Sequence, residues 1–109
     1  MERLCFLIHL FGGTEEEYDQ RHSDIWPEME EAVAAAGFRN YSLFRLGTQV
    51  IGYAECEPDV ETALKRMASF PVEHRWNASF ANVIMNSQSE NGGLTIVPEV
   101  WHLKMKSSM

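Results

Sequence analysis

Alternating apolar positions predict a strand over residues 2–11. Successive side chains of a strand point to opposite faces of the sheet. One face carries Leu4, Phe6, Ile8 and Leu10, and the other carries Cys5, Leu7, His9 and Phe11. Both faces are largely apolar, so we expect both to be covered in the folded protein. Gly12 and Gly13 end the strand.

A helix is predicted to follow, because large or apolar side chains recur at spacings of three and four. This stripe consists of Tyr18, His22, Ile25, Met29, Ala32 and Ala36. Thr14 and Glu17 have the spacing of a capping box, which predicts that the Thr14 hydroxyl accepts from the Glu17 amide. Pro27 lacks an N–H and clashes with the preceding turn, so we expect a break near Trp26. Gly37 suits the left-handed position that ends a helix.

Two further strands are predicted over residues 40–46 and 50–57, joined by a turn at Gly47. In the first of these strands, Tyr41 and Phe44 fall on opposite faces. If helices cover the Phe44 face, Tyr41 points to the opposite face, where a pocket can form.

In the second half of the chain, the pattern of apolar and proline residues predicts two more helical segments and a last strand. Pro58 and Asp59 begin the first segment, and Phe70 with Pro71 separates it from the second. The buried stripes are predicted to be Val60, Ala63, Leu64 and Met67, and then Val72, Trp76, Phe80 and Val83. A polar loop over residues 86–93 leads to a strand over 94–104.

The order of these elements is β-α-β-β-α-β, with the second helical position split in two. This order predicts a ferredoxin-like α+β fold with an antiparallel sheet and helices on one face only. The other face of the sheet then needs a cover. Because the first strand is apolar on both sides, we expect a second copy of the chain to supply it, in a homodimer.

Size and charge narrow the possible functions. The chain has 109 residues, which predicts a single domain over 1–109. Its formal net charge is −7 and it has no basic cluster, which argues against binding nucleic acid or an anionic membrane. No apolar run approaches the roughly 20 residues that span a bilayer. Because Glu2 and Arg3 lead directly into the first strand, we expect no signal peptide and a soluble, cytoplasmic protein.

His22 is the first candidate for chemistry. It follows Tyr18 by four residues, so both project from the same inward face of the predicted helix. Histidine has an unperturbed pKa near neutrality, which suits transfer of a proton in both directions. The same spacing is also typical of a core histidine whose ring is satisfied by its neighbours, and these residues alone leave both interpretations open.

Trp76 offers a second candidate, either as part of the core or as a flat apolar platform for a small ligand. A metal site made of His9, His22 and His102 has no supporting H-x-H or H-E-x-x-H spacing, so we expect no metal. Nucleotide-binding glycine motifs and the G-x-S-x-G motif are also absent from the sequence, so nothing suggests a cofactor or an acyl-enzyme.

Four blocks of the chain resemble the L-rhamnose mutarotase family. Residues 17–28, E-Y-D-Q-R-H-S-D-I-W-P-E, are similar to the family signature E-Y-x-x-R-H-x-x-I-W-P-E. Residues 37–41 match the block G-x-x-N-Y. Residues 72–76 are similar to a third block, and residues 98–101, P-E-V-W, resemble the closing strand.

The resemblance implies a ferredoxin-like, dimeric α/β-barrel-type assembly. It further implies a mutarotase that interconverts the α and β anomers of L-rhamnose without a cofactor. The proton donor of the family falls on His22, and its sugar-binding positions fall on Tyr18, Tyr41, Trp76 and Asn77. Well-known members carry a second tryptophan where this chain has Asn77. This departure leaves L-fucose or another sugar open as the substrate.

The fold by itself leaves other functions open, because ferredoxin-like dimers also host cofactor-free monooxygenases and small ligand-binding proteins. A monooxygenase would consume oxygen and would favour an apolar pocket. A non-catalytic binding dimer would tolerate replacement of His22.

Overall fold

In the computed structural model, which describes residues 1–89 and 91–105, four strands form one antiparallel sheet in the order β2-β3-β1-β4. The elements follow the chain as β1 (Glu2–His9), α1 (Glu15–Ser23), α2 (Pro27–Ala36), β2 (Phe38–Leu46), β3 (Gln49–Cys56), α3 (Val60–Ala68), α4 (Pro71–Ser79) and β4 (Thr95–Val97). This topology confirms the predicted ferredoxin-like α+β fold.

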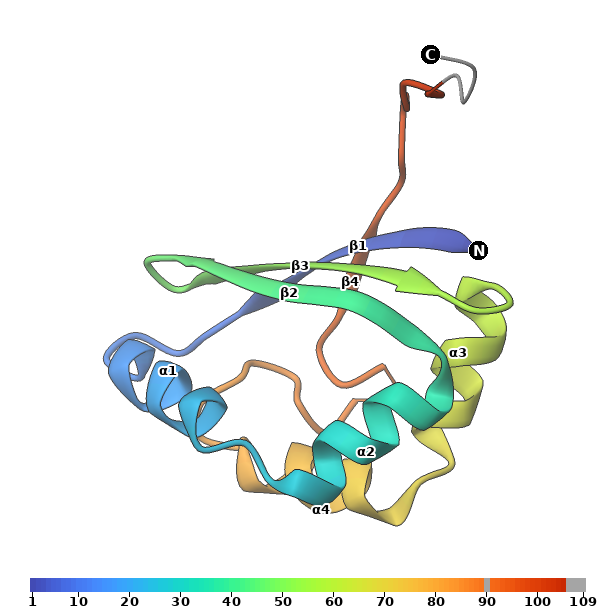
Figure 1. The fold of residues 1–109 in the computed structure, drawn as a ribbon. Helices are drawn as coiled ribbons and strands as arrows, with labels where there is room; N and C mark the ends of the chain where they lie inside the picture. Colours follow the sequence, from blue (N-terminus) through green and yellow to red (C-terminus); the bar gives the residue numbers. More distant parts are fainter. Residues whose placement is uncertain (90, 106–109) are drawn as a thin grey trace.

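The helices all lie on one side of the sheet, as Figure 1 shows, and the segment after β4 leaves on the opposite side. Both helical positions are split in two. The break between α1 and α2 falls where it was predicted, because Pro27 occupies the first turn of α2, where a missing N–H costs nothing. Gly37 then turns the chain into β2 with a φ of 112°. The backbone of Glu57 lies so close to Gly37 that a Cβ there has no room.

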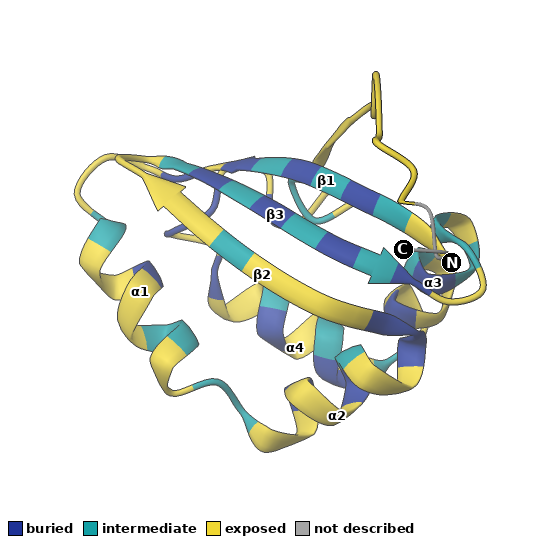
Figure 2. Ribbon diagram, turned by 45° about the horizontal axis from the view of Figure 1, so that its top comes forward, coloured by how far each residue is buried: buried dark blue, intermediate teal, exposed yellow. Residues whose placement is uncertain are grey.

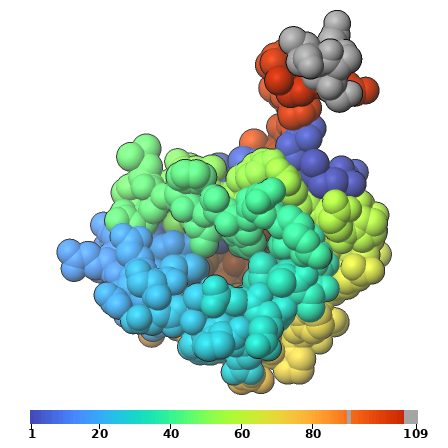
Figure 3. All heavy atoms as spheres, viewed as in Figure 1, coloured from blue at the N-terminus to red at the C-terminus, as the bar shows by residue number. Residues whose placement is uncertain are grey.

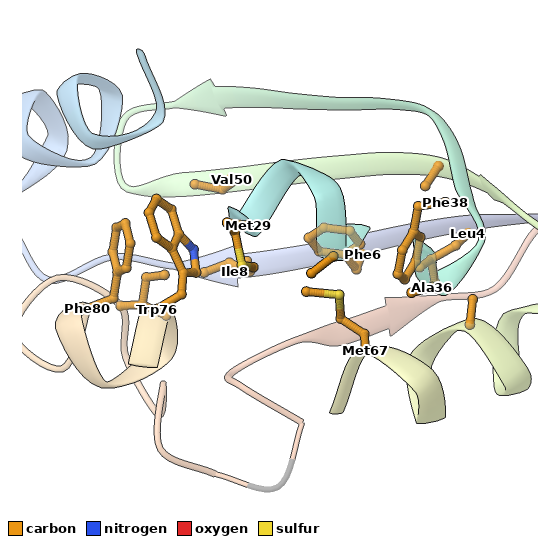
Figure 4. Packing of buried hydrophobic residues seen from close by; sticks show 14 of the residues in the cluster. Leu4, Phe6, Ile8, Met29, Ala36, Phe38, Val50, Met67, Trp76 and Phe80 are labelled. Carbon is orange, nitrogen blue, oxygen red and sulfur yellow. The ribbon is translucent and has the colours of Figure 1, made fainter. Parts of the chain in front are cut away.

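The core lies between the sheet and the helices (Figure 4). The inward side chains of β1 are Leu4, Phe6 and Ile8, and all three are buried. The Phe6 ring lies over Gly52 of β3, where any larger residue would meet the ring. From the other side, Trp76 of α4 and Phe80, which directly follows this helix, point toward the sheet (Figure 4). The predicted stripe of Val72, Trp76, Phe80 and Val83 is buried throughout, although α4 itself ends at Ser79.

The two helix starts that the sequence marked behave differently. Asp59 caps α3 as expected, since its carboxylate accepts from the Thr62 amide at 2.7 Å. The capping box predicted for Thr14 and Glu17 is wrong. Thr14 has φ −107° and ψ 8°, outside the extended conformation that a capping side chain needs. Its hydroxyl instead donates to the Phe11 carbonyl at 2.8 Å and closes the glycine turn.

The last strand is shorter than predicted. We expected residues 94–104 to be extended against the sheet, but β4 covers only Thr95–Val97 and pairs with Cys5–Leu7 of β1. Pro98 follows immediately and has no N–H to donate to a strand ladder. The chain beyond it points away from the sheet (Figure 1). Among the described residues, no helix has the length and apolar character needed to cross a bilayer.

Candidate active site

A cavity lies between the helix-facing side of the sheet and the helices. It has a volume of about 110 Å³ and adjoins a wider vestibule of about 330 Å³. Figure 3 shows the hollow between α1, α2 and β2, with atoms of the C-terminal third of the chain at its floor. His22, Tyr41 and Trp76 line both the cavity and the vestibule, so they lie where the two spaces meet.

The structure brings all five of the predicted site residues to this cavity. They come from three different elements, and they are Tyr18 and His22 of α1, Tyr41 of β2, and Trp76 and Asn77 of α4. Residues that lie up to 59 positions apart in the sequence therefore share one wall. The remaining lining is mostly apolar, which is typical of small-ligand sites with a few polar groups.

The His22 ring is held in one orientation by its own helix. Its Nδ1 lies 3.0 Å from the backbone carbonyl of Tyr18. A carbonyl oxygen only accepts, so Nδ1 carries the hydrogen in the neutral ring and donates it. Nε2 is then the basic nitrogen, and within the described part of the chain it makes no hydrogen bond. The imidazole is thus oriented at one nitrogen and free for proton transfer at the other.

The surroundings of His22 favour its neutral form. Burial lowers its pKa below 6.5, against the smaller opposing effects of the Tyr18 hydrogen bond and the Asp19 carboxylate. Aromatic rings provide this burial. The centroid of the His22 ring lies 4.3 Å from that of Tyr18, 5.4 Å from Trp76 and 5.6 Å from Phe80. An imidazole held at one nitrogen beside a cavity is suited to exchange a proton in both directions near neutral pH.

Trp76 belongs both to the core and to the cavity wall. Its side chain is buried, and its ring lies 4.8 Å from Phe80 and 5.0 Å from Trp26, centroid to centroid. It meets the His22 ring edge to face at 89°. Trp76 therefore fits both interpretations from the sequence, because it packs in the core and also lines the cavity.

Tyr41 lies on the helix-covered face of the sheet, and Phe44 lies on the opposite, exposed face. The pocket thus forms under the helices and not on the bare face of the sheet. A bulge between Arg39 and Ser42 displaces the register of β2 beside Tyr41. The Tyr41 ring contacts the core, with its centroid 5.7 Å from that of Phe38.

The two tyrosines keep their protons. Desolvation is the main cause that raises the pKa of the buried Tyr18 above the ordinary value of 10, and it acts in the same direction on Tyr41, which stays 40% exposed. Both phenols are therefore neutral hydroxyls at physiological pH. In that form they donate and accept hydrogen bonds but do not act as bases.

Glu73 is a site residue that we did not predict from the sequence. It lies on α4, one turn before Asn77, and lines the same cavity. The Asn77 side-chain amide donates to Glu73 Oε1 at 3.3 Å. Burial raises the pKa of Glu73 above 4.5, and the Asn77 hydrogen bond opposes this shift. The signal in the sequence was its spacing, because residues three and four apart on a helix share a face with Trp76 and Asn77.

The described residues contain no group of three histidine, cysteine or acidic side chains placed to hold a metal ion. His9 is exposed and lies on the face of β1 opposite to Leu4, Phe6 and Ile8. It therefore does not meet His22, which lies on the helix side of the sheet.

Comparison with known sequences identifies one family. Its model, described as L-rhamnose mutarotase, matches residues 3–103. An L-rhamnose mutarotase of Bacillus subtilis is 36% identical over 104 residues, which cover 94% of this chain and 99% of the relative. An L-rhamnose mutarotase of Listeria monocytogenes is 29% identical over 103 residues, with the same coverage of both chains.

Solved structures show the same fold. The crystal structure of an L-rhamnose mutarotase from Formosa agariphila superposes with a TM-score of 0.74 and 20% identity, covering 97% of this chain and 100% of that one. Tetracenomycin F2 cyclase from Streptomyces glaucescens, a type-II polyketide cyclase, superposes with a TM-score of 0.64 and 15% identity, covering 95% and 100%. At these identities the likeness concerns the architecture alone.

Proposed function

The chain belongs to the L-rhamnose mutarotase family, and we propose that it interconverts the α and β anomers of a deoxy-aldose, with L-rhamnose as the favoured substrate. Membership of this family makes the chain an isomerase. The acid/base mechanism and the roles of individual residues that follow are parts of the same proposal.

The observation that carries the mechanism is the state of His22. Its Nδ1 is tied to the Tyr18 carbonyl, its Nε2 has no hydrogen-bond partner among the described residues, and the residue lines both cavity and vestibule. A group that gives and takes protons needs this combination of fixed orientation and one available nitrogen. A core histidine with no further role would have both of its nitrogens satisfied.

Mutarotation opens the pyranose ring, rotates the aldehyde and closes the ring on the other face. Opening requires a proton delivered to the ring oxygen and a proton removed from the anomeric hydroxyl. We assign the delivery to protonated His22, which becomes neutral and recovers its proton on closure. Because no redox change occurs and no carbon–carbon bond forms, the reaction needs no cofactor.

The other wall residues hold the sugar in this proposal. Tyr18 and Tyr41 are neutral phenols and bind sugar hydroxyls. Trp76 places an apolar surface against the C–H face of the ring and excludes water there. Asn77 offers an amide to a further hydroxyl. Aromatic surfaces that present one apolar face beside a polar handle are suited to such amphipathic ligands.

We also propose a homodimer, supported by the apolar surface that the chain leaves uncovered. On the outer face of the sheet, Phe44 is 61% exposed and Leu46 is 76% exposed. Beyond β4, Val100 and Trp101 are 95% and 75% exposed. These exposed apolar side chains lie on the outer face of the sheet and on the segment that leaves it, where a partner chain would cover them. The two cysteines are free, as is usual in a reducing compartment, and we propose a cytoplasmic setting.

Polarimetry on freshly dissolved crystalline sugar tests the function. A single anomer of L-rhamnose relaxes slowly to the equilibrium mixture, and we expect the protein to accelerate this relaxation in proportion to its concentration. A parallel sample with L-fucose shows which of the two sugars the protein prefers, a question that Asn77 leaves open. A relaxation rate that is independent of protein for both sugars would refute the proposed function.

A further inference from the structure

Mutarotation needs a second proton carrier besides His22, and the cavity offers few groups for this task. Among the described residues that line it, the titratable side chains are Tyr18, His22, Tyr41 and Glu73. Both phenols stay protonated near neutral pH, because the ordinary pKa of tyrosine is about 10 and desolvation raises it further. Glu73 is thus the remaining group on this wall that can alternate between acid and base.

We propose that Glu73 is the second catalytic residue, whose carboxylate takes the proton of the anomeric hydroxyl while His22 protonates the ring oxygen. This inference rests on the proposed mutarotase function. The two groups reach the cavity from different helices, His22 from α1 and Glu73 from α4. Two separate proton carriers that line the same cavity allow both transfers in the same complex.

The Glu73 carboxylate is held in place by its own helix. Asn77 donates to Oε1 at 3.3 Å, which occupies one carboxylate oxygen and leaves Oε2 for the sugar. Asn77 is fixed in turn, because Gln88 Nε2 donates to its backbone carbonyl at 2.8 Å. The segment at Gly92 closes over the amide so tightly that a Cβ at Gly92 would come within 3.3 Å of Asn77 Nδ2. Asn77 therefore acts as a positioning residue for Glu73.

Glu30 is the nearest competitor for this role and fits it less well. It lines the vestibule and not the cavity, and it is exposed to solvent. Glu73 is half-buried, and desolvation strengthens its affinity for a proton. This higher proton affinity suits a base that acts on the anomeric hydroxyl, because proton transfer is most effective when the pKa lies near the working pH.

The proposed step balances without a further reactant. On opening, the bond between C1 and the ring oxygen breaks, its electron pair goes to the ring oxygen, and that oxygen takes the proton of His22. The anomeric O–H gives its proton to Glu73, and the electron pair of this bond completes the C1=O double bond. After rotation about C1–C2, both protons return by the same routes and the ring closes on the other face.

The expected pH dependence of kcat/KM follows from a single proton shared between His22 and Glu73. The reactive state holds one proton between His22 and Glu73, so kcat/KM falls both when the pair loses that proton and when it gains a second. The other titratable groups around Glu73 are Tyr18 of α1, Tyr41 of β2 and His74 of its own helix. The two phenols remain neutral, and His74 is exposed with its Nε2 at 2.7 Å from the Ala68 carbonyl.

Glu73→Gln tests the assignment, because glutamine keeps the shape and the oxygen that accepts from Asn77 but does not take up a proton. We expect kcat for L-rhamnose to fall by about 10²-fold or more with KM little changed, as for loss of a general base. The acidic limb of the kcat/KM profile should disappear while the alkaline limb remains. Glu61→Gln is the matched control, since Glu61 is an exposed carboxylate on α3 paired with Lys65, and its kcat should equal that of the wild type.

The outcomes separate this inference from the proposed function. Wild-type kcat in Glu73→Gln, or a loss confined to KM, would overturn the role of Glu73 while mutarotation stands. A wild-type kcat/KM profile with an alkaline limb alone would overturn it as well. If the wild-type protein leaves the exchange of L-rhamnose anomers unchanged, the proposed function fails, and the base assigned to that reaction fails with it.

Discussion

The two faces of the sheet carry similar apolar side chains but meet different surroundings. On the helix side, Leu4, Phe6 and Ile8 are at most 7% exposed. On the outer side, Phe44 and Leu46 of the same sheet are mostly exposed, and Figure 2 shows β2 as mostly exposed, in contrast to β1 and β3. The helix side has enclosed a cavity with an oriented histidine, and the outer side remains a surface for another molecule to cover.

The alternation of apolar side chains along a strand assigns each residue to a face of the sheet, but it does not say what covers that face. Tyr41 and Phe44 were correctly placed on opposite faces, yet only the packing of α1, α2 and α4 decides which of them joins a site. In our proposal, the helix side of the sheet carries the catalytic site and the outer face forms the dimer interface. Substitutions on each face should separate these two properties.

The largest effect should come from His22→Ala on the helix side. Loss of the proposed acid/base should reduce the catalysed rate of anomer interconversion by about 10²–10⁴. Because His22 is half-buried and its ring hydrogen bond is made to its own helix, the variant should keep the wild-type circular dichroism spectrum. His9→Gln on the outer face is the matched control and should keep the wild-type rate. A folded His22→Ala variant with an unchanged rate would remove His22 from the mechanism.

On the outer face, Phe44→Glu should weaken the proposed dimer. Burying a phenylalanine contributes about 1.5–3 kcal/mol. A two-fold interface loses this twice, so its dissociation constant should rise by about 10²–10⁴. Sedimentation velocity across a concentration series measures this shift. Ala78→Glu, which adds the same charge at an exposed position of α4, should leave the association unchanged. A wild-type protein that is monomeric at all concentrations would contradict the dimer.

A smaller effect is expected for Trp76→Phe, which keeps an aromatic ring but reduces the platform for the sugar. Full truncation to alanine would also cost about 3–5 kcal/mol of folding free energy, because Trp76 is part of the core. The phenylalanine variant should raise KM about fivefold, equivalent to about 1 kcal/mol of lost aromatic contact. Steady-state kinetics measures KM, and Trp101→Phe provides an exposed tryptophan for comparison. An unchanged KM would leave Trp76 with a role in the core only.

The smallest effect concerns stability and its dependence on pH. The raised pKa of Glu73 means that folding penalises its ionised form, so the penalty is absent below pH 4.5 and grows as pH rises through the folded-state pKa. Glu73→Gln removes this penalty. Its thermal midpoint should exceed that of the wild type by a few degrees at pH 8, and the difference should vanish near pH 4. Equal midpoints at both pH values would show that Glu73 carries no desolvation cost.

Much of this arrangement was predictable from local chemistry. The period of the apolar side chains predicted the order of the elements, and Pro27 and Pro71 predicted the helix breaks, because proline acts on its own turn. Tyr18 and His22 were predicted to share a helix face from their spacing, and both line the cavity.

Other features depended on contacts that the local sequence does not encode. The Thr14 hydroxyl could accept from the Glu17 amide or donate to a carbonyl of the glycine turn. In the structure it donates to the Phe11 carbonyl. The last strand ended at Val97, because Pro98 has no N–H for the ladder, although β1 itself continues from Cys5 to Glu2. Glu73 was not predicted as a site residue because its importance depends on α1 and β2 facing it across the cavity.

Saturation transfer by NMR measures the exchange between the two anomers of L-rhamnose without isolating either of them. In an equilibrated solution of L-rhamnose, irradiating the H1 resonance of one anomer reduces the signal of the other only if the two exchange within the relaxation time. We predict that the wild-type protein produces this transfer, in proportion to its concentration, through the cavity on the helix side of the sheet. The absence of any transfer at high protein concentration would contradict the claim that this pocket catalyses anomer exchange.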